Sequence, residues 1–252
     1  MNQIFSAPRF GAYFKKSFFE QIRNTLLQFV IMTGVLAFVI ALNDNRLMFF
    51  SNTLIFFIFS VAIASRFSDN FKTRPRKIEF LLTPASQFEK FLSFMIQAFI
   101  IVPILYTIAI FFAQYIAILL VAIFRLSAPV WTVPFSVVEI DTDFLAAFSI
   151  SYFGSVAYYI LGSTIWPRNS FLKTTAVTFA IGLVYTLLIT ISITSIAIQK
   201  LFIMNARELS LLHNIGSIAW TVTCIASILL TIIYLVIAYV RVTEFEVNET
   251  KH

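Results

Sequence analysis

One long polar stretch, RFSDNFKTRPRKIEFLLTPASQFEK, covers residues 66–90 and lies between two apolar runs that can each cross a lipid bilayer. It carries the signals of a short helix. Pro75 has the fixed φ that suits a first helical turn, and Thr73 just upstream is a candidate cap. Pro84 cannot donate a backbone hydrogen bond and disfavours the helical conformation of the residue before it, so this helix is predicted to end before Pro84.

A second helix is predicted directly afterwards. Ser86 and Glu89 match a capping box, in which each side chain accepts a hydrogen bond from the backbone N–H of the other residue. On the first helix, Ile78, Leu81 and Leu82 fall on one face at helical spacing. The stretch is therefore either a solvated basic loop with a turn or a docking helix presented at the membrane surface.

The composition of the chain is that of an integral membrane protein. Of its 252 residues 60% are hydrophobic and 12% are charged, whereas a soluble domain averages about 25% charged residues. A helix needs about 20 apolar residues to cross the hydrocarbon core. Six segments qualify, so we expect an all-α fold with six transmembrane helices, at about residues 26–42, 47–65, 94–124, 144–165, 174–198 and 215–240. The third segment is longer than needed and carries Pro103, which predicts a kink or a tilt.

The basic residues predict the orientation, because Lys and Arg collect on the cytoplasmic side. If the N-terminus is inside, four of the eighteen basic residues are outside: Arg46, Arg125, Lys200 and Arg207. The other fourteen are inside: Arg9, Lys15, Lys16, Arg23, Arg66, Lys72, Arg74, Arg76, Lys77, Lys90, Arg168, Lys173, Arg241 and Lys251. Both termini and residues 66–90 are thus predicted to be cytoplasmic, and this topology explains the basic pI without a nucleic-acid partner.

The segments that flank the spans have predicted roles of their own. Residues 1–25 form a cytoplasmic N-terminal segment, in which an apolar side chain recurs every four residues from Phe10 to Ile22. This stripe predicts an amphipathic helix in the membrane interface, and the alternative is an extension of the first span. Residues 199–214 mix apolar and charged side chains, which predicts a short re-entrant or interfacial helix. Residues 241–252 form a cytoplasmic tail.

The sequence offers little for catalysis. It contains no phosphate-binding loop of the form Gly-x-x-x-x-Gly-Lys and no HExxH or Gly-x-Ser-x-Gly pattern, and its two histidines lack metal-ligand spacing. The six predicted spans contain no Asp, Glu, Lys, Arg or His. Ion-coupled transporters usually keep such groups inside the membrane, so we expect any transport to be powered from outside the chain. We expect no metal and no cofactor in the chain, which is predicted not to be an enzyme.

Small residues mark a close helix contact in the fourth span. Gly154 and Gly162 share one face with Tyr158. Small residues at such spacing let two helices approach closely. Packing within the chain is favoured over a dimer seam.

The residues of the polar stretch resemble a known family. The segment LLTPASQFEKFLS, residues 81–93, lies between the second and third spans and resembles the coupling-helix region of permease subunits of ABC-2 type exporters, in the variant found in Bacteroidetes-like bacteria. Many members have Gly-Lys where this chain has Glu89-Lys90. The resemblance implies that a cytoplasmic ATPase subunit contacts Lys77, Ile78, Glu79, Phe80, Leu81, Leu82, Thr83, Pro84, Ala85 and Ser86.

The resemblance implies a permease subunit in a bacterial inner membrane. Its partners would be ATPase subunits that carry the ATP, and a second permease subunit, identical or related, with the translocation path between the two permeases. A membrane scaffold or assembly subunit without transport activity is the alternative, in which the basic loop would anchor to lipid or protein. An intramembrane enzyme is the third and weakest alternative. The substrate is not readable from the sequence.

Overall fold

The computed structural model describes residues 5–42, 45–124, 142–200 and 206–249, and over these residues the chain contains helices and no strand. The elements are α1 (Ala7–Leu42), α2 (Asn45–Ala64), the 3₁₀ helix η1 (Ser65–Asn70), α3 (Arg74–Leu82), α4 (Gln87–Ile96), the π-helical turn η2 (Gln97–Ile101), α5 (Val102–Phe124), α6 (Thr142–Ile165), α7 (Ser170–Lys200) and α8 (Ala206–Glu249).

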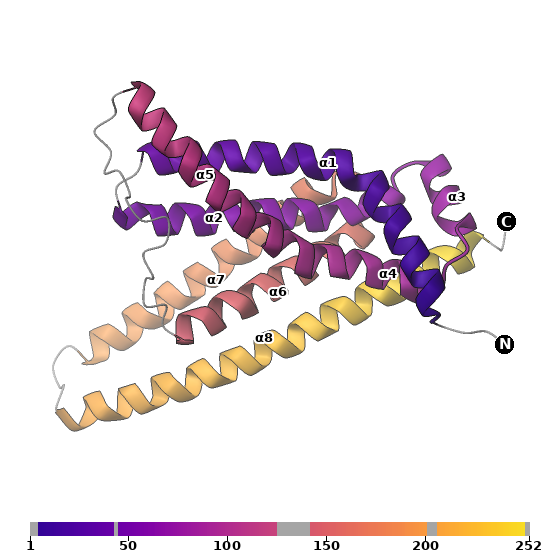
Figure 1. Ribbon diagram of the computed structural model, residues 1–252. Helices are drawn as coiled ribbons and strands as arrows, with labels where there is room; N and C mark the ends of the chain where they lie inside the picture. Colours follow the sequence, from indigo (N-terminus) through magenta and orange to yellow (C-terminus); the bar gives the residue numbers. More distant parts are fainter. Residues whose placement is uncertain (1–4, 43–44, 125–141, 201–205, 250–252) are drawn as a thin grey trace.

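Six helices of the described chain are long and apolar enough to cross a membrane: α1, α2 with η1, α4 with η2 and α5, α6, α7 and α8. Each of the six predicted spans lies within one of them, which confirms the all-α, six-helix prediction. The helices form an elongated bundle (Figure 1), in which the start of α1, the short helix α3 and the end of α8 lie together at one end of the molecule.

Two groups of buried apolar residues hold the bundle together. In the first, α1 packs on α5, where Ala109, Ala113 and Ala117 recur every four residues and are almost completely buried. Small side chains at that spacing let the two helices approach closely. The second group surrounds α6, which contacts α2, α7 and α8, and it continues through Phe67 of η1 toward α3 and α4. This second group therefore connects the bundle to the polar stretch.

The predicted kink near Pro103 takes the form of a π-helical turn. Within η2 the Val102 N–H donates to the carbonyl of Gln97, five residues earlier. In this pattern the carbonyl of Ala98 would accept from residue 103, which is a proline without an N–H. The Tyr152 hydroxyl of α6 donates to that carbonyl instead, at 2.6 Å. The axis of the α4–η2–α5 helix changes direction along its length (Figure 1), as expected where a proline interrupts the regular ladder.

The small residues of α6 pack within the chain. A Cβ atom added to Gly162 would lie 2.7 Å from Cγ2 of Thr174 on α7, and one added to Gly154 would lie 3.4 Å from the Thr231 hydroxyl on α8. Only glycine fits the first position without displacing a neighbour. Both contacts support packing within the chain, the alternative that the sequence favoured.

Two helix boundaries differ from expectation. Residues 9–25 belong to a single uninterrupted helix, α1, which bends in Figure 1 but does not break before the first apolar run. This is the alternative of an extended first span, and an interfacial position for the segment stays a prediction. The expectation of a separate short helix over 199–214 is wrong for the described residues, because α7 continues to Lys200 and α8 is continuous from Ala206.

Candidate functional site

Helix α3 begins and ends where the prolines predicted. Pro75 lies in its first turn, and Thr73 has the extended backbone of a cap, although its side chain makes no capping hydrogen bond. At the other end Thr83 is also extended, and its N–H and hydroxyl both donate to the carbonyl of Glu79, at 3.2 and 2.7 Å. Pro84 follows directly and accounts for this extended conformation.

The capping box at the start of α4 is confirmed, and its carboxylate does more than cap. The Glu89 N–H donates to the Ser86 hydroxyl at 3.2 Å, and the Ser86 N–H donates to Oε2 of Glu89 at 2.9 Å. Oε1 of Glu89 accepts from the Ser6 N–H at 2.8 Å, and Arg9 donates from Nε and Nη2 to the two carboxylate oxygens, each at 2.8 Å. The Glu89 side chain is completely buried, so it joins the start of α1 to the start of α4. We call this set of bonds the Glu89 clamp.

Arg9 sets the charge state of this carboxylate. Glu89 lies in α4, five residues before the predicted span that starts at Phe94. The pKa of Glu89 is lowered to about 2, mainly by the hydrogen bonds from Arg9 and also by those from the backbone N–H groups of Ser6 and Ser86, while burial opposes this shift. Glu89 is therefore ionised at neutral pH, and the clamp is a charged one.

Lys90 fixes the neighbouring helix. It is 2% exposed, and its ammonium donates to the carbonyl of Phe80 at 2.5 Å and lies 4.8 Å above the centre of the Phe80 ring. The Phe80 carbonyl belongs to the last turn of α3, where unpaired carbonyls and the helix dipole favour a cation. Adjacent residues of α4 thus hold α1 through Glu89 and α3 through Lys90.

The apolar residues of α3 face two ways. Phe80 is 7% exposed, and its ring packs on Phe71 with centroids 5.2 Å apart. Ile78 and Leu82 are 50% and 77% exposed, and Leu81 is half-buried. In this conformation the Phe80 ring therefore fills the chain's own core, and its contact with an ATPase subunit stays a prediction. The exposed apolar pair is Ile78 and Leu82.

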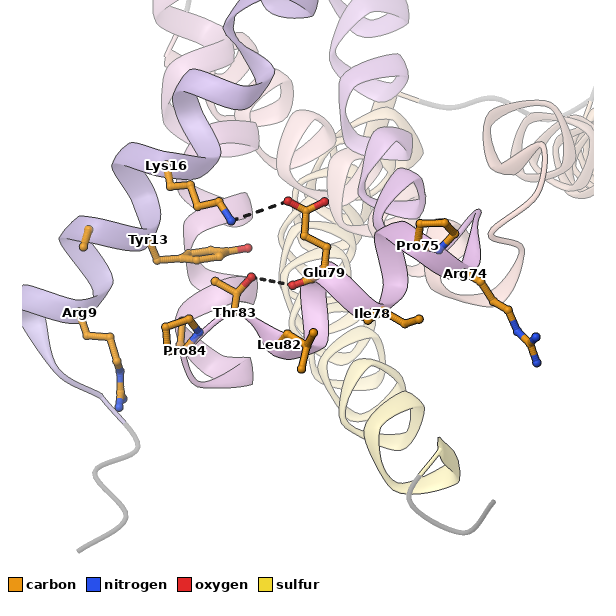
Figure 2. A pocket seen from close by; sticks show the side chains of 12 residues that line it. Arg9, Tyr13, Lys16, Arg74, Pro75, Ile78, Glu79, Leu82, Thr83 and Pro84 are labelled. Carbon is orange, nitrogen blue, oxygen red and sulfur yellow. Dashed lines mark hydrogen bonds and ion pairs between the residues drawn. The ribbon is translucent and has the colours of Figure 1, made fainter.

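A groove of about 850 Å³ lies between α3 and the first part of α1. Figure 2 shows Ile78, Leu82 and Pro84 on the α3 side and Arg9, Tyr13 and Lys16 on the α1 side, with the Lys16 ammonium 3.8 Å from the Glu79 carboxylate. We call it the α1–α3 groove. Its lining residues are Arg9, Ala12, Tyr13, Lys16, Arg74, Pro75, Ile78, Glu79, Leu82, Thr83, Pro84 and Ala85.

Only some of the predicted contact residues line this groove. Six of them line it: Ile78, Glu79, Leu82, Thr83, Pro84 and Ala85. Lys77, Phe80, Leu81 and Ser86 do not. The α1 wall was missed by sequence reasoning, although the stripe from Phe10 to Ile22 indicated a helix there. That stripe indicates the apolar face of the helix and carries no information on which distant segment packs against it.

The α1–α3 groove combines apolar and charged side chains, a lining that suits binding of a partner. Its lining includes the apolar side chains of Ile78, Leu82 and Pro84 and the cations Arg9, Lys16 and Arg74. Over the described residues no group of three or more His, Cys, Asp or Glu side chains is placed to hold a metal ion. Comparison of the chain with protein families, curated proteins and solved structures finds no match.

Proposed function

We propose that this chain is the membrane-spanning permease subunit of an ABC-2 type exporter, and that a separate cytoplasmic ATPase subunit docks on α3 and the α1–α3 groove. The observation that carries the proposal is that α3 is held firmly in place while two of its apolar side chains remain exposed. Glu89 and Lys90 tie the helix and its neighbours into the buried structure, yet Ile78 and Leu82 remain on the surface. A helix held in this way can transmit a displacement of its partner to α1 and α4.

The distribution of charge supports the orientation that docking requires. With fourteen of the eighteen basic residues on the side of α3, the positive-inside rule favours cytoplasmic termini and a cytoplasmic α3. The start of α1, α3 and the end of α8 share one end of the bundle, which is compatible with that topology. We place the protein in a bacterial inner membrane on the basis of the family resemblance.

The proposed energy source is ATP on the partner. The predicted spans lack Asp, Glu, Lys, Arg and His, so a proton or sodium relay within them has no evident carrier. In the proposed assembly two permease subunits, identical or related, form the translocation path between them. The chain itself then binds no cofactor and catalyses no reaction.

A non-transporting membrane scaffold is the second candidate function. Arg74 and Arg76 are exposed on α3 and Lys77 is half-buried there, so the helix presents basic groups that would suit an anionic lipid surface. Under this alternative the charges of α3, and not its apolar pair, provide the attachment. The two proposals therefore assign the binding energy to different side chains.

Two variants separate the candidates. Ile78→Ala with Leu82→Ala removes the exposed apolar pair, and Arg74→Gln, Arg76→Gln and Lys77→Gln together remove the charges. Leu172→Ala on α7 is a matched control, because Leu172 is 67% exposed and lies away from the groove. Phe80 is left intact, because truncating a buried Phe costs about 3–5 kcal/mol of stability and would confound any loss of binding.

The measurement is co-purification of an ABC-type ATPase subunit with each variant at two salt concentrations. Docking on α3 predicts that the double variant loses the ATPase while the charge variant keeps most of it, because exposed charges contribute only about 0–1 kcal/mol each. Undiminished recovery with the double variant would refute the docking role. Binding of each variant to vesicles of anionic lipid is measured in parallel. Loss of this binding in the charge variant, with no ATPase recovered from any variant, would favour the scaffold.

A further inference from the structure

A second, polar cavity lies on the membrane side of the α1–α3 groove. Its volume is about 330 Å³, within the range of about 300–1,000 Å³ that is usual for small-molecule sites. Tyr13, Lys16, Glu79 and Thr83 line both cavities, so the polar one continues the groove. Its further wall comes from later turns of α1 and from Arg66 in η1.

The cavity lies where the apolar runs begin. Asn24 of its wall is two residues before the run that starts at Leu26, and Arg66 follows the last residue of α2, Ala64, by two. Beyond Gln21 and Arg66 a crevice of about 20 Å³ continues with a mostly apolar lining that includes Ile63, Phe94, Ile101, Val102 and Leu105. At this change from polar to apolar lining we expect lipid headgroups to meet hydrocarbon.

The charges of the cavity are balanced. Its lining has three basic residues, Lys16, Arg66 and Arg76, and three acidic residues, Glu20, Asp69 and Glu79. Guanidinium and ammonium groups suit a phosphate, and carboxylates suit an ammonium group that donates hydrogen bonds. A purely anionic headgroup would meet three like charges here, and a choline group has no N–H to donate to the carboxylates.

The charged side chains of the cavity make only weak ion pairs with one another, and Asp69 is paired with Lys72, which does not line the cavity. The Lys16 ammonium lies 3.5 Å from the Glu20 carboxylate and 3.8 Å from that of Glu79, and all three side chains are about half exposed or more. Exposed pairs of this kind contribute little, so they exchange readily for a ligand. Arg66 donates to the Gln28 side chain at 2.7 Å and has further N–H groups in its guanidinium.

We propose that this polar cavity binds the phosphoethanolamine headgroup of a membrane lipid. The phosphate contacts Arg66, Arg76 and Lys16, and the primary ammonium contacts the carboxylates of Glu20 and Glu79. The acyl chains leave past Arg66 toward the bilayer. This site is independent of the proposed ATPase docking, because it requires a membrane protein and not an ABC transporter.

The test is thermal unfolding of the purified full chain in detergent, titrated with phosphatidylethanolamine, phosphatidylcholine or phosphatidylglycerol of the same acyl chains. Phosphatidylethanolamine is expected to raise the melting temperature at the lowest concentration. Because a charge-assisted hydrogen bond is lost, Arg76→Gln should weaken that apparent affinity about tenfold or more. Arg76 is exposed, so this variant is expected to fold.

A second variant makes the headgroup assignment specific. Glu20→Gln removes a partner of the ammonium group only. It should therefore weaken the apparent affinity for phosphatidylethanolamine and leave the affinity for phosphatidylglycerol unchanged or higher. Arg74→Gln and Glu244→Gln are the matched controls, because both residues are exposed and neither lines the cavity. Neither control is expected to change the order of the lipids.

Three results would overturn the proposal. The first is stabilisation by phosphatidylglycerol equal to or greater than that by phosphatidylethanolamine, which would indicate a general anionic site. The second is unchanged affinity in both Arg76→Gln and Glu20→Gln. The third is binding of water-soluble O-phosphoethanolamine as tightly as the lipid, which would assign the cavity to a free phosphate compound instead.

Discussion

Replacing Glu89 by alanine removes the carboxylate that accepts from Ser6, Arg9 and Ser86 in the Glu89 clamp, which joins the start of α1 to the start of α4. The Ser6 and Ser86 N–H groups then lose a charged acceptor. Hydrogen bonds to charged groups contribute about 1.5–3 kcal/mol each, and taking the lower value for these half-buried groups gives about 3 kcal/mol. The Arg9 side chain is 37% exposed and can be rehydrated, so its ion pair is left out of this sum.

The assay is hydrogen–deuterium exchange of the purified chain, read in peptides that cover residues 5–12 and 84–92. When opening is fast and reversible, a loss of about 3 kcal/mol corresponds to roughly a 100-fold faster exchange of the amides that the clamp protects. Glu79→Gln is the control, because the Glu79 side chain is 64% exposed and lies outside the clamp. An increase of less than about threefold in both peptides of Glu89→Ala would refute the reasoning.

Acid provides an independent check on the same clamp. The pKa of Glu89 is about 2 in the folded chain, against an ordinary value of 4.5. A carboxyl group whose pKa is lowered by folding stabilises the fold fully above its ordinary value and loses that contribution as the pH falls toward the lowered one. After correction for the intrinsic rate, exchange in the two peptides should therefore rise between pH 4.5 and 2 in the wild-type chain. In Glu89→Ala this additional rise should be absent.

Two further predictions concern packing and topology. Gly162→Ala should lower the stability by about 1–3 kcal/mol because its methyl group overlaps Thr174, and adding Thr174→Ala should recover most of the loss; a double variant that melts no higher than Gly162→Ala in thermal unfolding would contradict this. In a Cys224→Ser background, a cysteine at Thr73 should react with an impermeant thiol reagent only after the inner face is opened, and one at Asn45 should react from outside. Labelling of both from the same side would contradict the proposed orientation.

The features that the sequence predicted correctly depend on neighbours along the chain. Apolar runs of membrane-spanning length predict helices because backbone polar groups must be paired within the segment in a bilayer. Pro84 ends α3 through its own ring and missing N–H, and the Ser86–Glu89 box needs only residues three apart. Such interactions are decided within one or two helical turns, so they can be read without knowledge of the fold.

The features that only the tertiary structure decided depend on contacts between distant segments. Helical spacing grouped Ile78, Leu81 and Leu82, but packing against Phe71 decided that Phe80 is buried while Ile78 and Leu82 remain exposed. In the same way, Arg9 lies 80 residues from Glu89 in the chain, and no local pattern pairs them. The physical reason is that periodicity determines which side chains share a face of a helix, whereas the identity of the surface that covers that face is set by the packing of all the helices together.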